Sequence, residues 1–463
     1  MHRILMARFM EQLTYIRIFF ALFFPLLLLL KAWRRRSSGD GVRLPPGPWR
    51  LPVIGSLHHI MCSWLPYHAM ADLSRRLDAP LMYLRLGEVP VVVASSPERR
   101  AAREIMKTHD VNFATRPWSP TMRVLLADGE GLVFAPYGPL WRQLRRISIL
   151  ELLSARRVQS FRRVREDQRI YETTMDMTMR SIMDDRFEKR DDFLEVFAEG
   201  VKITSGFNLG DPFPSSRLAS FLSGTARRAE ANHRKNGELV DCVIRQHEEK
   251  KATGADGAVD EEDLVDVLMR IHKEGGLEVP VTMGIIRAFI LDLFAARGET
   301  TANALQWAMS ELMRNPEAMH KAQAELHHSL QGKTTVTEED LADLKYLKLV
   351  IMETLRLHPV VPLLLPRECG ETCKVMGYDV LKGTTVFVNA WATWFWVPGG
   401  EFGYRPANIE LTLASLLYHF RWKLLAGVSS RELDMTEKMG ITVGRKNDLL
   451  LHRMVYIPSP TVL

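Results

Sequence analysis

The segment between Pro280 and Pro316 constrains the fold more than any other part of the chain. It contains no proline, and about 30 helical residues at 1.5 Å each would form a rod roughly 45 Å long. The segment is apolar nearly all round, yet it includes four charged residues, Arg287, Asp292, Arg297 and Glu299. A membrane span rarely carries four charges. We therefore predict a helix buried through the middle of a large soluble domain.

Composition excludes several classes of protein. The chain has 463 residues, of which 46% are hydrophobic and 25% are charged, values typical of globular proteins. Four cysteines are too few for a disulfide scaffold and indicate a reducing compartment. The first 50 residues hold nine basic and two acidic side chains, so they account for the net charge of +6. The rest is nearly neutral, which argues against a nucleic-acid partner.

The N-terminus has the pattern of a membrane anchor. An unbroken apolar run covers residues 18–30, with Arg17 and Lys31 at its ends and three arginines at 34–36. The arginines place the following chain in the cytosol, and no small-x-small site for signal cleavage follows the run. We predict a single-pass anchor over residues 1–36 in the endoplasmic reticulum membrane. A cleaved secretory signal is the competing interpretation.

The rest of the chain divides into a short proline-rich segment and one large domain. Residues 37–56 include Leu-Pro-Pro-Gly-Pro at 44–48 and are predicted to form a stiff hinge. In the predicted single domain, 57–463, residues 80–95 have the pattern of a β-hairpin and 384–388 that of a strand. Helical patterns dominate from 97 to 357 and return at 409–420, whereas 248–262 is predicted to be a surface loop. The fold class is mainly α with a smaller β part.

Two pairs of residues stand out because their spacing places them on one face of a helix. Glu353 and Arg356 are three residues apart and are followed by Pro-Arg-Glu at 366–368. Trp141 and Arg145 are one turn apart, and an indole N–H beside a guanidinium suits an anionic group such as a propionate. The alternative for the second pair is the edge of an ordinary amphipathic helix.

An acid and two hydroxyls interrupt the long apolar helix, at Glu299, Thr300 and Thr301. Polar groups at such a place are either satisfied locally or used. The local interpretation is a bond from a side chain to the backbone. The functional one is proton delivery at a buried site.

Taken in order, these motifs resemble those of the plant microsomal cytochrome P-450 family, the heme-thiolate monooxygenases. The resemblance covers about nine-tenths of the chain. It rests on the order of LPPGP at 44–48, FATRP at 113–117, WRQLR at 141–145, GETT at 298–301, ETLR at 353–356, PRE at 366–368, VNAWA at 388–392 and ANIELTLASLLYHF at 407–420.

The resemblance implies a cytochrome P-450 type α+β fold and a role for each matching residue. Trp141, Arg145 and Arg367 would bind the heme propionates. Glu299 and Thr300 would be the catalytic acid–alcohol pair that relays protons. Glu353 and Arg356 would form a structural ion pair that locks the fold.

The same resemblance implies a cofactor and partners. The cofactor would be heme, with electrons from NADPH arriving through an NADPH-dependent reductase. The substrate would be a lipophilic small molecule, a terpenoid or another secondary metabolite. We expect the segments 118–124 and 212–221 to face it.

The chain departs from the family at two places. Relatives carry a meander and a Cys-containing loop after the region like VNAWA, and that Cys is the axial ligand of the iron. Here Asn408 already begins the helix that follows the loop, and no cysteine occurs beyond Cys373. The domain is therefore shortened around 392–408, and no metal ligand is assigned. The second departure is Arg297, where relatives usually have glycine.

The sequence therefore leaves two functions open. One is a membrane-bound monooxygenase that oxidises a lipophilic molecule with O2, impaired in this chain. The other is a non-catalytic relative, or a shortened gene model, that lacks thiolate-ligated heme. Heme binding is in question because the thiolate supplies the electron density for O–O cleavage.

Overall fold

The computed structural model describes most of the chain downstream of the predicted anchor. The described residues are 41–61, 65–95, 100–126, 131–152, 187, 189–205, 208, 210–253, 264–331, 333–393, 407–425 and 427–455. The predicted anchor, residues 1–36, lies outside them. Within these ranges, no helix has both the length and the apolar character needed to cross a bilayer.

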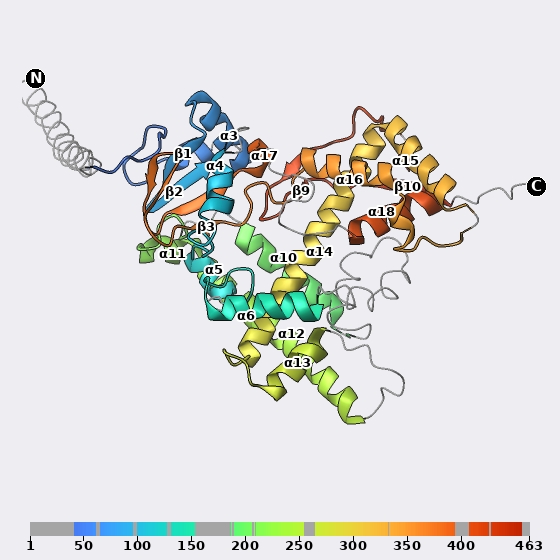
Figure 1. Cartoon of the computed structure of the whole chain (residues 1–463), viewed down its shortest axis with the longest axis horizontal. Helices are drawn as coiled ribbons and strands as arrows, with labels where there is room; N and C mark the ends of the chain where they lie inside the picture. The colour runs from blue at the N-terminus through green and yellow to red at the C-terminus, as the bar shows by residue number, and fades with distance from the viewer. Residues whose placement is uncertain are drawn as a thin grey trace, which may run out of the picture.

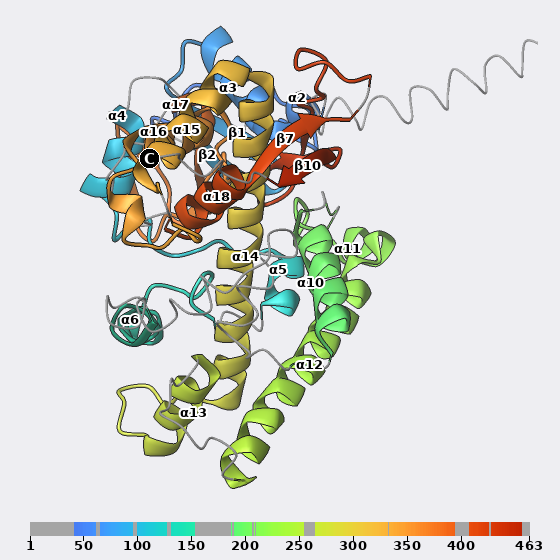
Figure 2. The ribbon, with the colours of Figure 1, turned by 90° about the vertical axis from the view of Figure 1, so that its right-hand side faces the viewer.

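A single long helix organises the molecule, as the sequence predicts. This helix, α14, covers Met283–Arg314. The Thr282 hydroxyl accepts the Ile285 N–H at 3.2 Å and caps its start. Pro316 begins the next helix, α15 (Pro316–Ser329), because proline is tolerated in a first turn but not in a helix interior. Figure 2 shows α14 running vertically through the body, with most other elements gathered around its two ends.

Two groups of helices surround the two ends of α14. Its C-terminal half packs with α15, α16 (Lys345–Leu357) and α18 (Ala407–His419) in one apolar cluster. Its N-terminal half packs with α12 (Thr225–Thr253) and α13 (Leu264–Glu274) in another. Figure 2 places α6 (Pro139–Ile147) on one side of α14 and α12 on the other.

A small mixed sheet lies near the N-terminal end of the described chain (Figure 1). Its order is β1-β2-β6-β3, with β1 at Leu81–Leu86, β2 at Val89–Ala94, β6 at Thr385–Val388 and β3 at Arg367–Glu368. The β1–β2 pair is the predicted hairpin, antiparallel with Leu81 opposite Ala94. β6 pairs parallel with β2 and antiparallel with β3, so residues near 90 and near 367 share one sheet.

Short elements complete the fold. The remaining helices are α2 (Leu57–Met61), α3 (Pro66–Arg76), α4 (Arg100–Arg103), η1 (Glu104–Thr108), α5 (Pro120–Leu125), η3 (Ser148–Leu152), α10 (Arg190–Ser205), α11 (Arg217–Ser223), η4 (Asp340–Ala342) and α17 (Ala390–Thr393). Three two-stranded sheets pair β4 (Cys373–Val375) with β5 (Tyr378–Val380), β7 (Phe420–Leu424) with β10 (Leu451–Val455), and β8 (Glu437–Lys438) with β9 (Gly444–Arg445). Helices outweigh strands, as the predicted fold class requires.

The proline-rich motif lies against β1. The Tyr83 N–H donates to the Pro46 carbonyl at 2.8 Å. A Cβ on Gly47 would lie 2.0 Å from the Tyr83 carbonyl oxygen, so only glycine fits at this position. Ser56 continues the contact through its N–H, which donates to the Arg85 carbonyl at 2.6 Å.

One predicted boundary is wrong. The surface loop predicted for 248–262 begins later, because α12 continues as helix through Thr253. Residues 248–252 are Glu-Glu-Lys-Lys-Ala, all good helix formers, so intrinsic propensity outweighs the lack of apolar side chains. Residues 254–263 lie outside the described part of the chain.

Candidate functional site

Two arginines from distant parts of the sequence meet beside β3. Arg367 is 8% exposed, and its Nη1 donates to Asp110 Oδ1 at 2.7 Å and to the Phe113 carbonyl at 3.3 Å. Arg116, from the FATRP motif, donates from Nη1 to the Pro366 carbonyl at 3.2 Å. Burial and then the neighbouring charge of Arg367 lower the pKa of Arg116 to about 10, although Asp110 acts in the opposite direction.

This arginine pair has the chemistry of an anion site. Two guanidiniums face one carboxylate, that of Asp110, whose side chain is 52% exposed. The pair therefore holds an excess positive charge in a partly buried place, and a carboxylate ligand would offset it. The residues present thus fit the carboxylate end of a group such as heme. In the sequence, Arg116 is only one residue of the FATRP motif. Nothing in the sequence indicates that it lies near Arg367.

Trp141 and Arg145 lie together on the outer face of α6. The Arg145 guanidinium is 5.1 Å from the centre of the Trp141 ring, and that ring also lies 5.3 Å from Tyr137. The buried residues of α6 are Gln143, Leu144 and Ile147. The structure therefore brings this predicted pair together, but in the described contacts it joins the pair neither to Arg367 nor to Glu299.

Glu299 is held by a residue from the C-terminal region. The Thr442 hydroxyl donates to Glu299 Oε1 at 2.6 Å, and Asn303, one turn along α14, donates to the same hydroxyl at 3.2 Å. Burial raises the pKa of Glu299, while the Thr442 hydrogen bond and the charge of Lys438 act in the opposite direction. A carboxyl whose pKa is raised toward neutrality suits proton transfer.

The two threonines after Glu299 differ in their surroundings. The Thr300 hydroxyl donates to the Ala296 carbonyl at 2.7 Å, which is the local interpretation considered for this segment. Thr301 is 3% exposed, and its hydroxyl has no hydrogen-bond partner among the described residues. Arg297 also lies on α14, but its side chain is outside the described part of the structure.

The predicted ion pair on α16 is present but exposed. Arg356 donates to both Glu353 oxygens, from Nε at 2.6 Å and from Nη2 at 2.5 Å. The side chains are 56% exposed for Glu353 and 32% for Arg356. Glu353 is thus mostly exposed in the pair that the resemblance implies to be structural. An exposed pair is screened by water and stabilises little.

The described cysteines lie in two different parts of the fold. Cys369 is fully buried beside Asn112 and packs in the cluster around β2 and β6, and Cys373 begins β4. Cys242 lies on α12. Cys62 lies outside the described residues. In the described ranges, no group of three or more His, Cys, Asp or Glu side chains could hold a metal ion.

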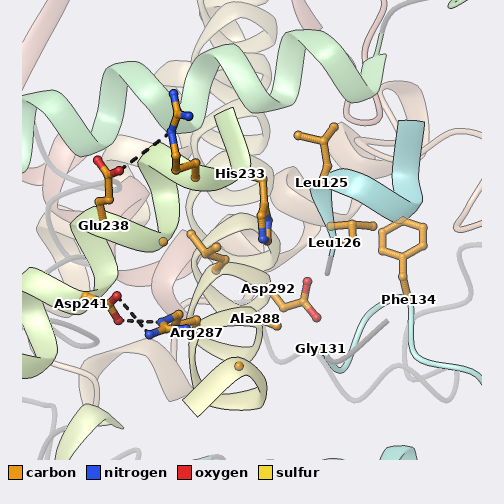
Figure 3. Close-up of a pocket in the computed structure, with 14 residues that line it drawn as sticks. Leu125, Leu126, Gly131, Phe134, His233, Glu238, Asp241, Arg287, Ala288 and Asp292 are labelled. Atoms are coloured by element: carbon orange, nitrogen blue, oxygen red, sulfur yellow. Dashed lines mark hydrogen bonds and ion pairs between the residues drawn. The ribbon is translucent and has the colours of Figure 1, made fainter. Parts of the chain in front are cut away.

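A cavity of about 390 Å³ lies beside the N-terminal half of α14 (Figure 3). It is bounded by α5, α12, α14 and the loop that begins at Gly131. Asp292 builds this wall, because its Oδ2 accepts the Val133 N–H at 2.8 Å. Burial raises the pKa of Asp292 to about 6, opposed by the N–H groups of Val133 and Leu132. Leu125, the last residue of α5, lines the cavity and lies one residue beyond the predicted substrate-facing segment 118–124.

Comparisons with known proteins agree with the motif order. The family model described as Cytochrome P450 matches residues 45–171 and 163–394. Premnaspirodiene oxygenase of Hyoscyamus muticus is 40% identical over 495 residues, covering 95% of this chain and 98% of the relative. Zealexin A1 synthase of Zea mays is 40% identical, with 90% and 93% covered. 5-epiaristolochene 1,3-dihydroxylase of Nicotiana tabacum is 38% identical, with 95% and 98% covered.

Two further features of these matches concern the length of the chain and the extent of the family match. The alignment with the Hyoscyamus protein spans 495 positions, more than the 463 residues of the chain, so that relative contains segments that the chain lacks. The family match ends at residue 394, just after α17, and residues 395–463 lie outside it.

Proposed function

Because the chain belongs to the cytochrome P450 family, we propose that it binds a lipophilic small molecule and that its oxygen-insertion step is impaired. Its relatives include a premnaspirodiene oxygenase and a 5-epiaristolochene 1,3-dihydroxylase, both plant monooxygenase-type enzymes. We place the substrate in the same broad class, terpenoids and similar secondary metabolites.

The residues that would hold the heme propionates support the chemistry of the family. The family implies heme and electrons supplied by a reductase from NADPH. Arg116 and Arg367 would hold a propionate, because together they carry more positive charge than Asp110 offsets. Trp141 and Arg145 would contact a second carboxylate from the outer face of α6.

The chain lacks the thiolate that binds the iron in the family, and this single observation carries the proposal. A thiolate ligand gives the family its chemistry, and no cysteine occurs in this chain after Cys373. The family match stops at residue 394, near the predicted loss of the Cys-containing loop. We therefore derive no reaction step through the iron in this chain.

The membrane location is part of the same proposal. The apolar run at 18–30 and the arginines at 34–36 support a single anchor in the endoplasmic reticulum membrane, with the domain on the cytosolic side. Fractionation tests it. Deleting residues 1–36 should move the protein into the soluble fraction, and a full-length chain found there already would contradict it.

Absorbance of the reduced protein with carbon monoxide tests the missing ligand. The chain as written should give no thiolate-type spectrum. Inserting the Cys-containing segment of a relative between Ala392 and Asn408 should restore it. Changing Arg297→Gly, alone and with the insertion, separates the two departures from the family. A normal thiolate spectrum from the unmodified chain would overturn the proposal.

An active monooxygenase is the second candidate, and Glu299 favours it. This carboxyl is half-buried, held by Thr442, and has a raised pKa, as a proton donor needs. Product formation from a terpenoid with NADPH and a reductase would support this candidate. Sequencing the cDNA across Ala392–Asn408 would show whether a longer chain exists.

A further inference from the structure

Two cysteines lie close together just after β3. The Cys369 N–H donates to the Thr384 carbonyl at 2.9 Å, and Cys373 pairs with Val380 across the β4–β5 hairpin. The Cys369 sulfur lies 3.5 Å from the Val380 carbonyl oxygen, so it reaches the residue that faces Cys373. Residues directly opposite each other in an antiparallel pair have Cα atoms about 5 Å apart. Both cysteines therefore lie beside one residue of β5.

The side chains of these two cysteines also interact directly. Burial raises the pKa of the Cys369 thiol to about 12, and the charge of Cys373 and a side-chain hydrogen bond with it act in the same direction. Both side chains pack in the apolar cluster around β2 and β6, where Cys369 is fully buried and Cys373 is partly exposed. A disulfide forms without backbone movement only where the two side chains already face each other, and a hydrogen bond between the thiols places them so.

The loop between the two cysteines is held from both sides. The backbone bends at Gly370 and Glu371. The Asn112 carbonyl accepts the Gly370 N–H at 2.9 Å. The Asn112 side chain accepts the Glu371 N–H at 2.7 Å and donates to the Glu371 carbonyl at 2.8 Å. The Thr372 hydroxyl accepts the Lys382 N–H at 3.0 Å. These contacts keep the two thiols together while no bond joins them.

A redox pair explains these thiols better than a metal site does. Structural zinc takes four protein ligands, and in the described ranges no group of three or more His, Cys, Asp or Glu side chains could hold a metal ion. The low cysteine content indicates a reducing compartment, which keeps such a pair as thiols at rest. Disulfides that form in such compartments are usually transient and report on oxidants.

We propose that Cys369 and Cys373 form a reversible disulfide when the protein meets a peroxide. Hydrogen peroxide oxidises the partly exposed Cys373 thiol to a sulfenic acid and is itself reduced to one water. The Cys369 sulfur then attacks the Cys373 sulfur, the S–O bond breaks, and the hydroxide leaves with the Cys369 proton as a second water. Two thiols and one hydrogen peroxide thus give one disulfide and two waters. A dithiol reductant reverses the reaction by exchange.

The disulfide acts on the segment that orients the arginine pair. The Cys369 thiol donates to the Glu371 carbonyl at 3.0 Å, and oxidation removes this hydrogen bond. Asn112 donates to the same carbonyl, and it lies between Asp110 and Phe113, which both accept hydrogen bonds from one arginine of the pair. Oxidation should therefore loosen the loop where it meets this segment.

Peptide mapping of the full-length chain tests this inference. Trypsin cleaves after arginine and lysine and releases residues 368–374, which contain both cysteines and neither Cys62 nor Cys242. After hydrogen peroxide, and then iodoacetamide in urea, this peptide should lack two hydrogen atoms and carry no alkyl group. Dithiothreitol added before the iodoacetamide should restore two alkylated thiols.

Serine variants and hydrogen exchange complete the test. Cys373→Ser should leave Cys369 as a thiol that iodoacetamide alkylates. Cys242→Ser, at the partly exposed cysteine of α12, is the matched control and should keep the disulfide product. Exchange of the Gly370 and Glu371 amides should be about threefold faster in the oxidised wild type, the scale of one weak hydrogen bond. Peroxide should not change it in Cys373→Ser.

This inference and the proposed function stand or fall separately, because the disulfide needs neither heme nor substrate. Two alkylated thiols after peroxide, a sulfinic acid at Cys373 without a disulfide, or a bond from this peptide to Cys62 or Cys242 would overturn the inference. An unchanged exchange rate would overturn the effect on the arginine pair. None of these results alters the carbon monoxide spectrum, and a thiolate spectrum from the unmodified chain would leave the disulfide standing.

Discussion

Replacing His358 tests how the C-terminal region is held to the helical core. His358 follows α16 directly, and its Nε2 lies 2.8 Å from Glu311 Oε1 on α14. Its Nδ1 lies 3.8 Å from Glu437 Oε1 on β8. The ring is parallel to that of Trp307, with the centres 4.0 Å apart. One imidazole thus joins three elements that are far apart in the sequence.

The magnitude follows from burial. The side chains of His358, Glu311 and Glu437 are 14%, 16% and 13% exposed. His358→Phe keeps a ring against Trp307 but leaves two largely buried carboxylates without their cation. Removing one member of a buried ion pair typically costs ~3–5 kcal/mol. Other partners remain, since Arg314 lies 3.8 Å from Glu311 and the Tyr67 hydroxyl donates to Glu437. We therefore expect a loss of about 2–3 kcal/mol.

The effect should depend on pH in a defined direction. Burial opposes the charge on His358, but the hydrogen bond to Glu311 and the negative charges of Glu311 and Glu437 outweigh it and raise its pKa above 6.5. A raised cation pKa adds stability that is complete below about pH 6.5 and lost as pH rises through the folded value. The pKa values of both carboxyls are lowered from 4.5, so their contribution fades at lower pH. The difference between wild type and variant should be largest at about pH 5–6.5.

Urea unfolding at pH 5.5 and pH 8.5 measures this difference. The matched control is His320→Phe, on the exposed face of α15, which should change the free energy of unfolding by less than about 0.5 kcal/mol. If His358→Phe behaves like this control at pH 5.5, or costs more at pH 8.5, the buried ion pair does not stabilise the fold as argued.

Three further substitutions test separate features of the structure. Glu353→Ala should cost less than ~1 kcal/mol in urea unfolding, because its pair with Arg356 is exposed, and a loss above 2 kcal/mol would contradict this. Gly47→Ala should lower stability by more than ~2 kcal/mol, since its Cβ would meet the Tyr83 carbonyl; an unchanged melting temperature would refute that contact. In the wild type, the raised pKa of Asp292 lowers stability as pH rises from about 4 to 6, because burial penalises the ionised carboxylate, and Asp292→Asn should remove this fall. An unchanged slope of stability against pH would contradict this prediction.

Local sequence signals predicted the main elements. Proline at both ends and an apolar interior predict α14 with nearly its observed bounds. β-branched residues after Gly87 predict the β1–β2 hairpin. In contrast, the extension of α12 to Thr253 depends on helix propensity in a charged segment that pattern alone assigns to a loop.

The site was predicted less completely because its contacts join distant residues. Arg367 and Asp110 are 257 positions apart, and Thr442 and Glu299 are 143 apart. No periodicity in one segment indicates such a partner in another.

Exposed apolar side chains on α16 indicate that another segment could pack there and stabilise the fold. Leu349 is 57% exposed and Met352 40%, on the same face as the Glu353–Arg356 pair. Apolar side chains around an ion pair form a surface of the kind that another segment usually covers. We predict that the chain has lost such a segment between Ala392 and Asn408. Its loss would explain why this face is open.

Restoring that segment should therefore change the energetics of the ion pair as well as the spectrum. In the chain as written, Glu353→Ala should cost less than ~1 kcal/mol. With the Cys-containing segment of a relative inserted between Ala392 and Asn408, the same substitution should cost about 3–5 kcal/mol, because the pair would be buried and its arginine left unpaired. Urea unfolding of the four proteins completes a double-mutant cycle. A coupling energy near zero would mean that the inserted segment does not cover α16, and the open face would need another cause.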